Sequence, residues 1–234
     1  MNTKAIIVAG GKSERFNSER PKQFTDILGK PLLAWTIEKF QQSKELTAII
    51  VVVPEKFIKF TKEEIVEKYQ FDKVSKVIAG GKTRAESVYN GLLSLSKDTE
   101  LVAIHDSARA IVDSEDIRRV IESATKADGA ILASRVTDTI KQVKEIQIEK
   151  TINRSQLFLA QTPQVFEYRK ILGVHKKLNE SGYEKEFTDD SLMMEENGFR
   201  INLVESKHLN FKVTTKEDLS LLKSVMKNKM ELEK

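Results

Sequence analysis

The chain has 234 residues, 40% of them hydrophobic and 32% charged, and a formal net charge of +4. This length is enough for one good-sized core, so we expect one domain over residues 1–234. The absence of cysteine excludes disulfides, thiol nucleophiles and thiolate metal sites, and the three scattered histidines argue against a zinc site.

Short apolar runs alternate with longer amphipathic stretches up to about residue 134. The predicted strands are Ala5–Ala9, Ala48–Pro54, Lys73–Gly80, Leu101–Asp106 and Gly129–Ser134. The predicted helices are Pro31–Ser43, Ala85–Leu95 and Ser114–Ala127. Continuous apolar strands that alternate with helices indicate a parallel sheet covered on both faces. The pattern therefore predicts an α/β, doubly wound fold with a mostly parallel sheet.

The segment Arg135–Gln156 interrupts this alternation. It is polar and β-branched, and Val143, Ile146 and Ile148 alternate loosely with charged residues. The pattern predicts a β-hairpin arm that leaves the core and turns near Lys144–Gln147. Since an isolated hairpin is only marginally stable in water, two interpretations stay open: an edge hairpin, or an arm that packs on a second subunit.

The remaining segment returns to helices and strands. We expect helices at Tyr168–Gly182 and at Asp189–Gly198, the latter ended by its glycine. A pair of strands is predicted around Phe199–Ser206 and Leu209–Thr215, followed by a last helix over Lys216–Met230.

Charge and hydropathy limit the classes of partner. The sequence contains no apolar run near the ~18 residues of a membrane span, and its start does not resemble a secretory signal. We therefore expect a soluble, cytoplasmic protein without a membrane partner. Basic and acidic residues are interleaved and aromatic residues make up 7%, a composition that favours small anionic substrates over nucleic acid.

The segment Ala9–Phe24, "AGGKSERFNSERPKQF", combines a glycine turn with several basic residues. It follows a predicted strand, where backbone N–H groups and a helix N-terminus can hold phosphate. A Walker loop is excluded because Ile6 stands where that motif requires glycine. The alternative interpretation is an ordinary glycine turn with solvated charges.

Two further strand ends carry polar residues. Asp106 ends a predicted strand at the edge where ligands gather in α/β sheets, and one carboxylate there can hold Mg²⁺ together with substrate phosphates. Its alternative role is to cap a turn and pair with Arg109. A second glycine turn, Ala79–Ser87, places Arg84 and Ser87 one helical turn apart.

These segments, taken in order, resemble the 2-C-methyl-D-erythritol 4-phosphate cytidylyltransferase family. The resemblance rests on the first loop with "PKQF", on "GGKTRAESVYNGL", "HDSAR", "LAQTPQVF" and "FTDDS", and on "NFKVTTKEDL". It implies a Rossmann-like nucleotidyltransferase domain whose arm makes a homodimer. It also implies condensation of CTP with a sugar-alcohol phosphate. Pentitol-phosphate enzymes that act on ribitol 5-phosphate share several of these segments and remain an alternative, as does, more remotely, a non-catalytic nucleotide sensor.

The resemblance also implies roles for individual residues. The implied catalytic cations are Arg15, Lys22, Arg154 and Lys212. The implied substrate contacts are Ala9, Gly10, Gly11, Gly81, Arg84, Ser87, Asp106, Arg109, Thr139, Thr162 and Thr188. Asp106 is the implied ligand of Mg²⁺ or another divalent cation, while Thr139 and Arg154 would reach the partner's site from the arm. Ser13 and Ala110 depart from the family pattern, which has glycine and proline there.

The chemistry agrees with this set of residues. The nucleophile would be a phosphate monoester, whose second pKa of ~6 leaves it ionised near neutral pH. No general base is then required, and positioning and charge neutralisation supply most of the rate.

Overall fold

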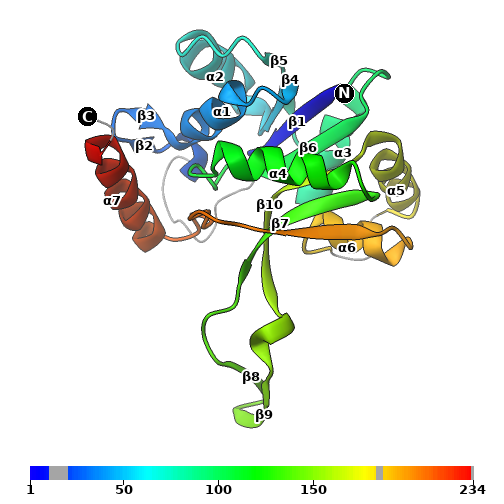
Figure 1. The fold of residues 1–234 in the computed structure, drawn as a ribbon. Helices are drawn as coiled ribbons and strands as arrows, with labels where there is room; N and C mark the ends of the chain where they lie inside the picture. The colour runs from blue at the N-terminus through cyan, green and yellow to red at the C-terminus, as the bar shows by residue number, and fades with distance from the viewer. Residues whose placement is uncertain (11–20, 183–186, 233–234) are drawn as a thin grey trace.

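A seven-stranded sheet runs through the middle of the molecule in the order β11-β7-β10-β6-β1-β4-β5 (Figure 1). The computed structural model describes residues 1–10, 21–182 and 187–232. Its central strands are β1 (Thr3–Val8), β4 (Leu46–Val53), β5 (Val74–Ala79), β6 (Leu101–Asp106), β7 (Gly129–Arg135), β10 (Phe158–Glu167) and β11 (Ile201–Glu205). All pair in parallel except β10, which runs antiparallel to β6 and β7. This arrangement confirms the predicted α/β fold.

Helices cover both faces of the sheet. The α-helices are α1 (Leu32–Gln42), α2 (Ile58–Thr61), α3 (Arg84–Ser94), α4 (Ser114–Ala124), α5 (Tyr168–Glu180), α6 (Asp190–Glu196) and α7 (Lys216–Leu232). The shorter turns are η2 (Lys22–Phe24), η3 (Glu55–Phe57), the π-helical η4 (Lys62–Glu67) and η5 (Arg154–Gln156). Neither α2 nor its flanking turns were predicted. In the part of the chain that the structure describes, no helix has the length and apolar character needed to cross a membrane.

The two faces of the sheet bury separate clusters because successive strand residues point in opposite directions. Ile7 of β1 joins one core with Phe40 of α1, and Ile6 joins the other with Leu92 of α3. Helix α3 approaches the sheet closely at Gly91, where a Cβ atom would lie 2.7 Å from Ile6. A third cluster packs α7 against the segment after β6 and includes Ala110, which is 1% exposed.

One predicted strand is wrong, and three strands were missed: β10 and the short antiparallel pair β2 (Asp26–Ile27) and β3 (Lys30–Pro31). Leu209–Thr215 does not form a strand, although its apolar residues alternate. Val213 is buried in the α7 cluster, and its N–H donates to the carbonyl of Ala108 rather than to a neighbouring strand. The longest missed strand is β10, whose alternation is interrupted by buried polar residues such as Gln164. Gly198 ends α6 with φ +81°, as predicted.

The polar segment after β7 forms a hairpin of β8 (Ile140–Lys144) and β9 (Gln147–Ile152), which projects from the body (Figure 1). A register shift after Gln142 places Val143 opposite Ile148 instead of opposite Glu149. The arm therefore carries a paired apolar surface, and Ile146 at its turn is 96% exposed.

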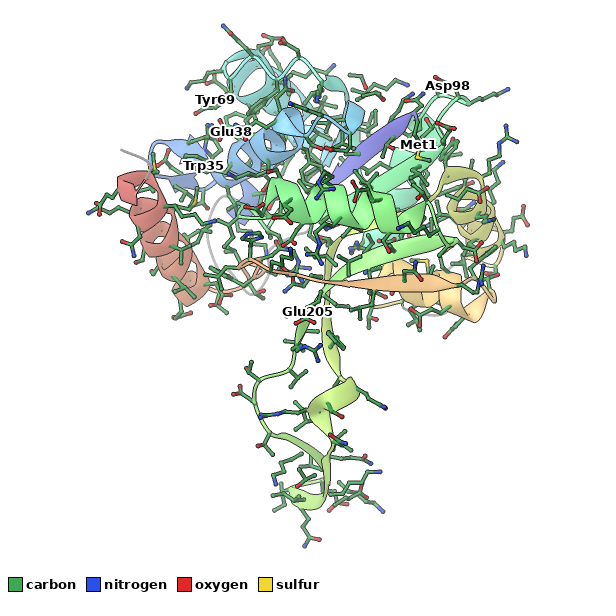
Figure 2. All side chains as sticks on the ribbon, viewed as in Figure 1. Met1, Trp35, Glu38, Tyr69, Asp98 and Glu205 are labelled. Carbon is green, nitrogen blue, oxygen red and sulfur yellow. The ribbon has the colours of Figure 1, made fainter. Side chains whose placement is uncertain are left out.

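The arm is tied to the sheet at its base. Figure 2 shows Glu205, the last residue of β11, where the arm leaves the body. Its carboxylate accepts a hydrogen bond of 2.9 Å from Nε of Arg135, the last residue of β7. The Arg135 guanidinium also lies 5.0 Å from the ring centroid of Phe158 in β10. These contacts join both strands that carry the arm to the edge of the sheet.

Candidate active site

A cleft of about 220 Å³ lies where β6 ends. Its lining residues are Arg84, Asp106, Arg109, Ala160, Gln161, Thr162, Gln164, Thr188, Asp189 and Lys212. Six of these were predicted site residues: Arg84, Asp106, Arg109, Thr162, Thr188 and Lys212. The cleft lies beyond the carboxyl end of a central parallel strand, which is the usual ligand site in open α/β sheets.

Asp106 is the electrostatic centre of the cleft. Its side chain is 12% exposed, and it accepts a hydrogen bond of 2.7 Å from Nζ of Lys212 and one of 3.1 Å from Nε of Arg84. Burial alone would raise the pKa of this carboxyl, but the charges of Arg84 and Lys212 outweigh it. The net pKa of Asp106 lies well below its usual range, so the group is an anion at any physiological pH.

Arg84 connects Asp106 to a residue that the sequence did not single out. Its Nη2 lies 2.8 Å from Oδ2 of Asp190, whose side chain is 0% exposed. Burial lowers the pKa of the Arg84 guanidinium, but the two carboxylates outweigh burial and the net pKa is raised. Arg84 is therefore a permanent cation held between two anions.

A chain of hydrogen bonds fixes the backbone of Asp106. Its N–H donates to Oγ1 of Thr162 at 3.1 Å, which directs the threonine proton to Nδ1 of His105 at 3.0 Å. The proton of the neutral imidazole then lies on Nε2, which donates to the carbonyl of Arg109 at 3.1 Å. Burial lowers the pKa of His105 to about 3. The ring is therefore neutral and acts as a fixed spacer beneath the site.

This buried histidine predicts a specific pH dependence of stability. The pKa of His105 falls from 6.5 to about 3 on folding, so the unfolded chain binds the extra proton between these values. The free energy of unfolding therefore decreases as pH falls below 6.5, and we expect His105 to account for roughly 2 kcal/mol between pH 7 and pH 5. Urea unfolding of the wild type and of His105→Gln would measure this. Equal pH slopes for the two proteins would contradict the assignment.

The loop that carries Lys212 is held by Asn210. The Asn210 amide donates to Oε1 of Gln161 at 3.0 Å and to the carbonyl of Thr162 at 2.8 Å. The backbone carbonyl of Asn210 accepts a hydrogen bond of 2.6 Å from Nη1 of Arg109. Asn210 and Gln161 were not predicted, since an amide that supports a loop has no sequence pattern of its own.

Ser87 joins the two glycine turns. Its hydroxyl oxygen accepts a hydrogen bond of 3.0 Å from the N–H of Gly81, and its O–H donates one of 2.8 Å to the carbonyl of Thr83. A Cβ atom on Gly10 would lie 3.0 Å from this oxygen, and one on Gly80 would lie 2.8 Å from it. Glycine at both positions lets the two turns approach the same serine, so the predicted residues Gly10, Gly81 and Ser87 lie together.

The start of the first loop is held to the sheet. The N–H of Ala9 donates a hydrogen bond of 2.7 Å to the carbonyl of Val52. The carbonyl of Ala9 accepts a hydrogen bond of 2.6 Å from the side-chain amide of Gln23. Nζ of Lys22 donates a hydrogen bond of 2.6 Å to the carbonyl of Val213, the residue after Lys212. Three residues singled out in the sequence lie outside the described residues: Gly11, Ser13 and Arg15.

Two predicted site residues lie on the arm and not in the body of the chain. The predicted residues Ala9, Gly10, Lys22, Gly81 and Ser87 lie in the body but do not line the cleft either. Thr139 and Arg154 are exposed on the arm, and Nη1 of Arg154 donates to the carbonyl of Thr137. The arm projects away from the body of its own chain (Figure 1). Within one chain, these two residues therefore do not join the cations around Asp106.

Three comparisons relate this chain to known proteins. Residues 3–228 match the family model described as IspD: 2-C-methyl-D-erythritol 4-phosphate cytidylyltransferase. A protein of that name from Clostridium botulinum (strain Loch Maree / Type A3) is 43% identical over 223 residues, with 94% of this chain and 96% of the relative covered. One from Clostridium acetobutylicum is 42% identical over 224 residues, with 95% and 96% covered.

Solved structures agree with the sequence relatives. The 4-diphosphocytidyl-2C-methyl-D-erythritol synthase of Anaerococcus prevotii superimposes with a TM-score of 0.84 at 27% identity, covering 97% of this chain and 96% of that one. The 2-C-methyl-D-erythritol 4-phosphate cytidylyltransferase of Francisella tularensis gives 0.79 at 30% identity, covering 95% and 98%. The resemblance found in the sequence is thus confirmed, and the chain belongs to the 2-C-methyl-D-erythritol 4-phosphate cytidylyltransferase family.

Proposed function

We propose that this cleft condenses CTP with 2-C-methyl-D-erythritol 4-phosphate. An oxygen of the polyol phosphate attacks the α-phosphorus of CTP, a new P–O bond forms, and the bond to the β-phosphate breaks. The products are 4-diphosphocytidyl-2-C-methyl-D-erythritol and pyrophosphate. The observation that carries the proposal is the anion Asp106 between Arg84 and Lys212, in a cleft of a chain of this family.

The donor set fits a divalent cation that is bound together with the nucleotide. Among the residues that the structure describes, no three His, Asp or Glu side chains gather to hold a metal. Mg²⁺ needs fewer, because it keeps several waters and takes the rest of its oxygens from one carboxylate and the substrate phosphates. Asp106 would supply that carboxylate, and Mg²⁺ bound there would neutralise phosphate charge. Lys212, whose side chain is 41% exposed, is free to turn from Asp106 toward the phosphates.

The reaction needs cations rather than a base. The attacking phosphate is already ionised near neutral pH, and the barrier is the approach of a dianion to a triphosphate. Nζ of Lys22 donates to the carbonyl of Val213, the residue after Lys212, so we place both lysines beside the substrate phosphates. We assign Arg15 and Arg154 to the same neutralisation of phosphate charge. By analogy with a lost oxyanion donor, removal of one such cation costs about 2.7–4 kcal/mol of transition-state stabilisation.

We also propose that the arm completes the site of a second copy. Val143, Ile146 and Ile148 are 55%, 96% and 62% exposed, which is costly for a hairpin that remains in water. Packing on a partner would bury them and carry Thr139 and Arg154 to the other cleft. The cytoplasmic location inferred from the sequence stays a prediction.

A direct assay tests the proposed reaction. Purified protein, CTP and Mg²⁺ are incubated with a panel of polyol phosphates, and pyrophosphate release is followed. We expect release with 2-C-methyl-D-erythritol 4-phosphate and loss of release in EDTA. Release only with ribitol 5-phosphate would assign the chain to the pentitol-phosphate reaction, and tight CTP binding without turnover would indicate a nucleotide sensor.

A further inference from the structure

Asp190, the first residue of α6, is a fully buried carboxylate next to the cleft. It does not line the cleft but stands behind Arg84, with 2.8 Å between its Oδ2 and Nη2 of the arginine. Its backbone is held independently of Arg84, because its N–H donates a hydrogen bond of 3.1 Å to Oε1 of the buried Gln164. The position of its charge is therefore set by β10 and not by Arg84 alone.

The burial of this carboxylate has a cost that pairing only partly offsets. Removing a carboxylate from water costs several kcal/mol, and a buried ion pair is often no more stable than an apolar pair of similar volume. Arg84 already has Asp106 as a partner and is itself 26% exposed. Arg84 is therefore not neutralised by Asp190 alone. Oδ1 of Asp190 also lies 3.7 Å from Nε2 of the buried His175, while Oδ2 faces Arg84.

The four charged groups form an alternating row. Asp190, Arg84, Asp106 and Lys212 carry negative, positive, negative and positive charge, and successive partners are 2.8, 3.1 and 2.7 Å apart. In this row Asp190 balances Arg84. Without it, the whole charge of Arg84 would act on Asp106 and compete with any incoming cation.

We propose that Asp190 is a positioning residue that balances Arg84 and so keeps the negative charge of Asp106 available to the divalent cation that enters with CTP. This inference rests on the proposed function. Asp190 touches neither nucleotide nor metal in this scheme and acts through Arg84. Asp190 is the second aspartate of "FTDDS". The first, Asp189, is the N-cap of α6, and its side chain accepts a hydrogen bond from the N–H of Leu192.

The charge argument predicts opposite effects on two binding constants. Asp190→Asn removes one negative charge, so metal-free CTP, an anion, should bind as well as or better than it binds to the wild type. The gain in CTP affinity on adding Mg²⁺ should fall by about 10–100-fold, the usual cost of losing a group that supports a metal ligand. Calorimetric titration of CTP in EDTA and in saturating Mg²⁺ gives both constants, and their ratio measures the coupling between metal and nucleotide.

A matched control separates this role from plain destabilisation. Asp116 in α4 is also 0% exposed and pairs with an arginine, Nη1 of Arg119, at 3.0 Å. Among the described residues, its other hydrogen-bond and ion-pair partners are Ser206, Lys207 and His208, none of which lines the cleft. Asp116→Asn should lower the melting temperature yet leave the ratio of CTP affinities at the wild-type value.

A second variant tests the same role if Asp190→Asn does not fold. Arg84→Lys keeps one positive charge but lacks the planar fork that reaches two carboxylates, and we expect it to lower the ratio similarly. A wild-type ratio in either folded variant, or equal weakening of metal-free and Mg²⁺-supported CTP binding, would overturn the inference. If the wild type itself shows no gain from Mg²⁺, the proposed metal role fails instead, and the two failures are distinct.

Discussion

Asp106→Asn is expected to lower kcat/KM for pyrophosphate release by about 10²–10³-fold, the range found when a preorganised charge-stabilising group is lost. Asparagine has nearly the same shape, and the backbone N–H that donates to Thr162 is unchanged, so the fold should persist. The carboxylate charge that balances Arg84 and Lys212 disappears, and with it the one group proposed to hold the metal. Initial rates at varied CTP and Mg²⁺ concentrations would measure the loss.

The control must remove a buried aspartate without touching the cleft. Asp116→Asn meets this condition, because Asp116 is as buried as Asp190 and pairs elsewhere. We expect it to retain kcat/KM within a few-fold, while circular dichroism confirms that both variants fold. Near-normal activity of Asp106→Asn would show that the metal assignment and the central role of Asp106 are wrong.

The second large effect is expected from mixing two inactive variants. Lys212→Met damages the cleft and Arg154→Met damages the arm, and each alone should lose about 10²–10³ in rate. If the arm of one protomer serves the cleft of the other, a mixed dimer has one site with both lesions and one intact site. Random exchange of protomers should then restore about a quarter of wild-type activity, because half of the dimers are mixed.

The outcome separates an arm that acts in trans from one that does not. If Arg154 acted on its own cleft, or took no part in the reaction, mixing would not restore an intact site in this way. Sedimentation at the assay concentration provides an independent measurement, since a single 26.6 kDa species would contradict the dimer. Each variant alone at the total protein concentration of the mixture is the appropriate control.

The sequence predicts the frame of this molecule because the signals that specify it are local. The strand Leu101–Asp106 is buried on both faces, and its first four residues form an unbroken apolar run. The shared site of Arg84 and Asp106, remote in the chain, was expected only from the resemblance to the cytidylyltransferase family. The structure brings them within 3.1 Å.

The missed features depend on contacts between distant segments. Asp190 looks like part of a helix cap in the sequence, yet its carboxylate pairs with Arg84 more than a hundred positions earlier. The apolar alternation around Val213 fits a strand as well as it fits a loop packed against α7, and only the destination of its backbone hydrogen bonds distinguishes the two. In both cases the partner, not the residue type, determines the structure.

The hydrogen bond from Lys22 to the carbonyl of Val213 links the segments of the two lysines that we propose act on the substrate phosphates. Lys212 immediately precedes that carbonyl, so a movement of either segment is transmitted to the other through a contact of 2.6 Å. Loss of Lys22 would remove a positive charge and one of the two backbone hydrogen bonds at Val213, next to Lys212. If both lysines act on the substrate phosphates as proposed, we expect their contributions to the barrier not to add.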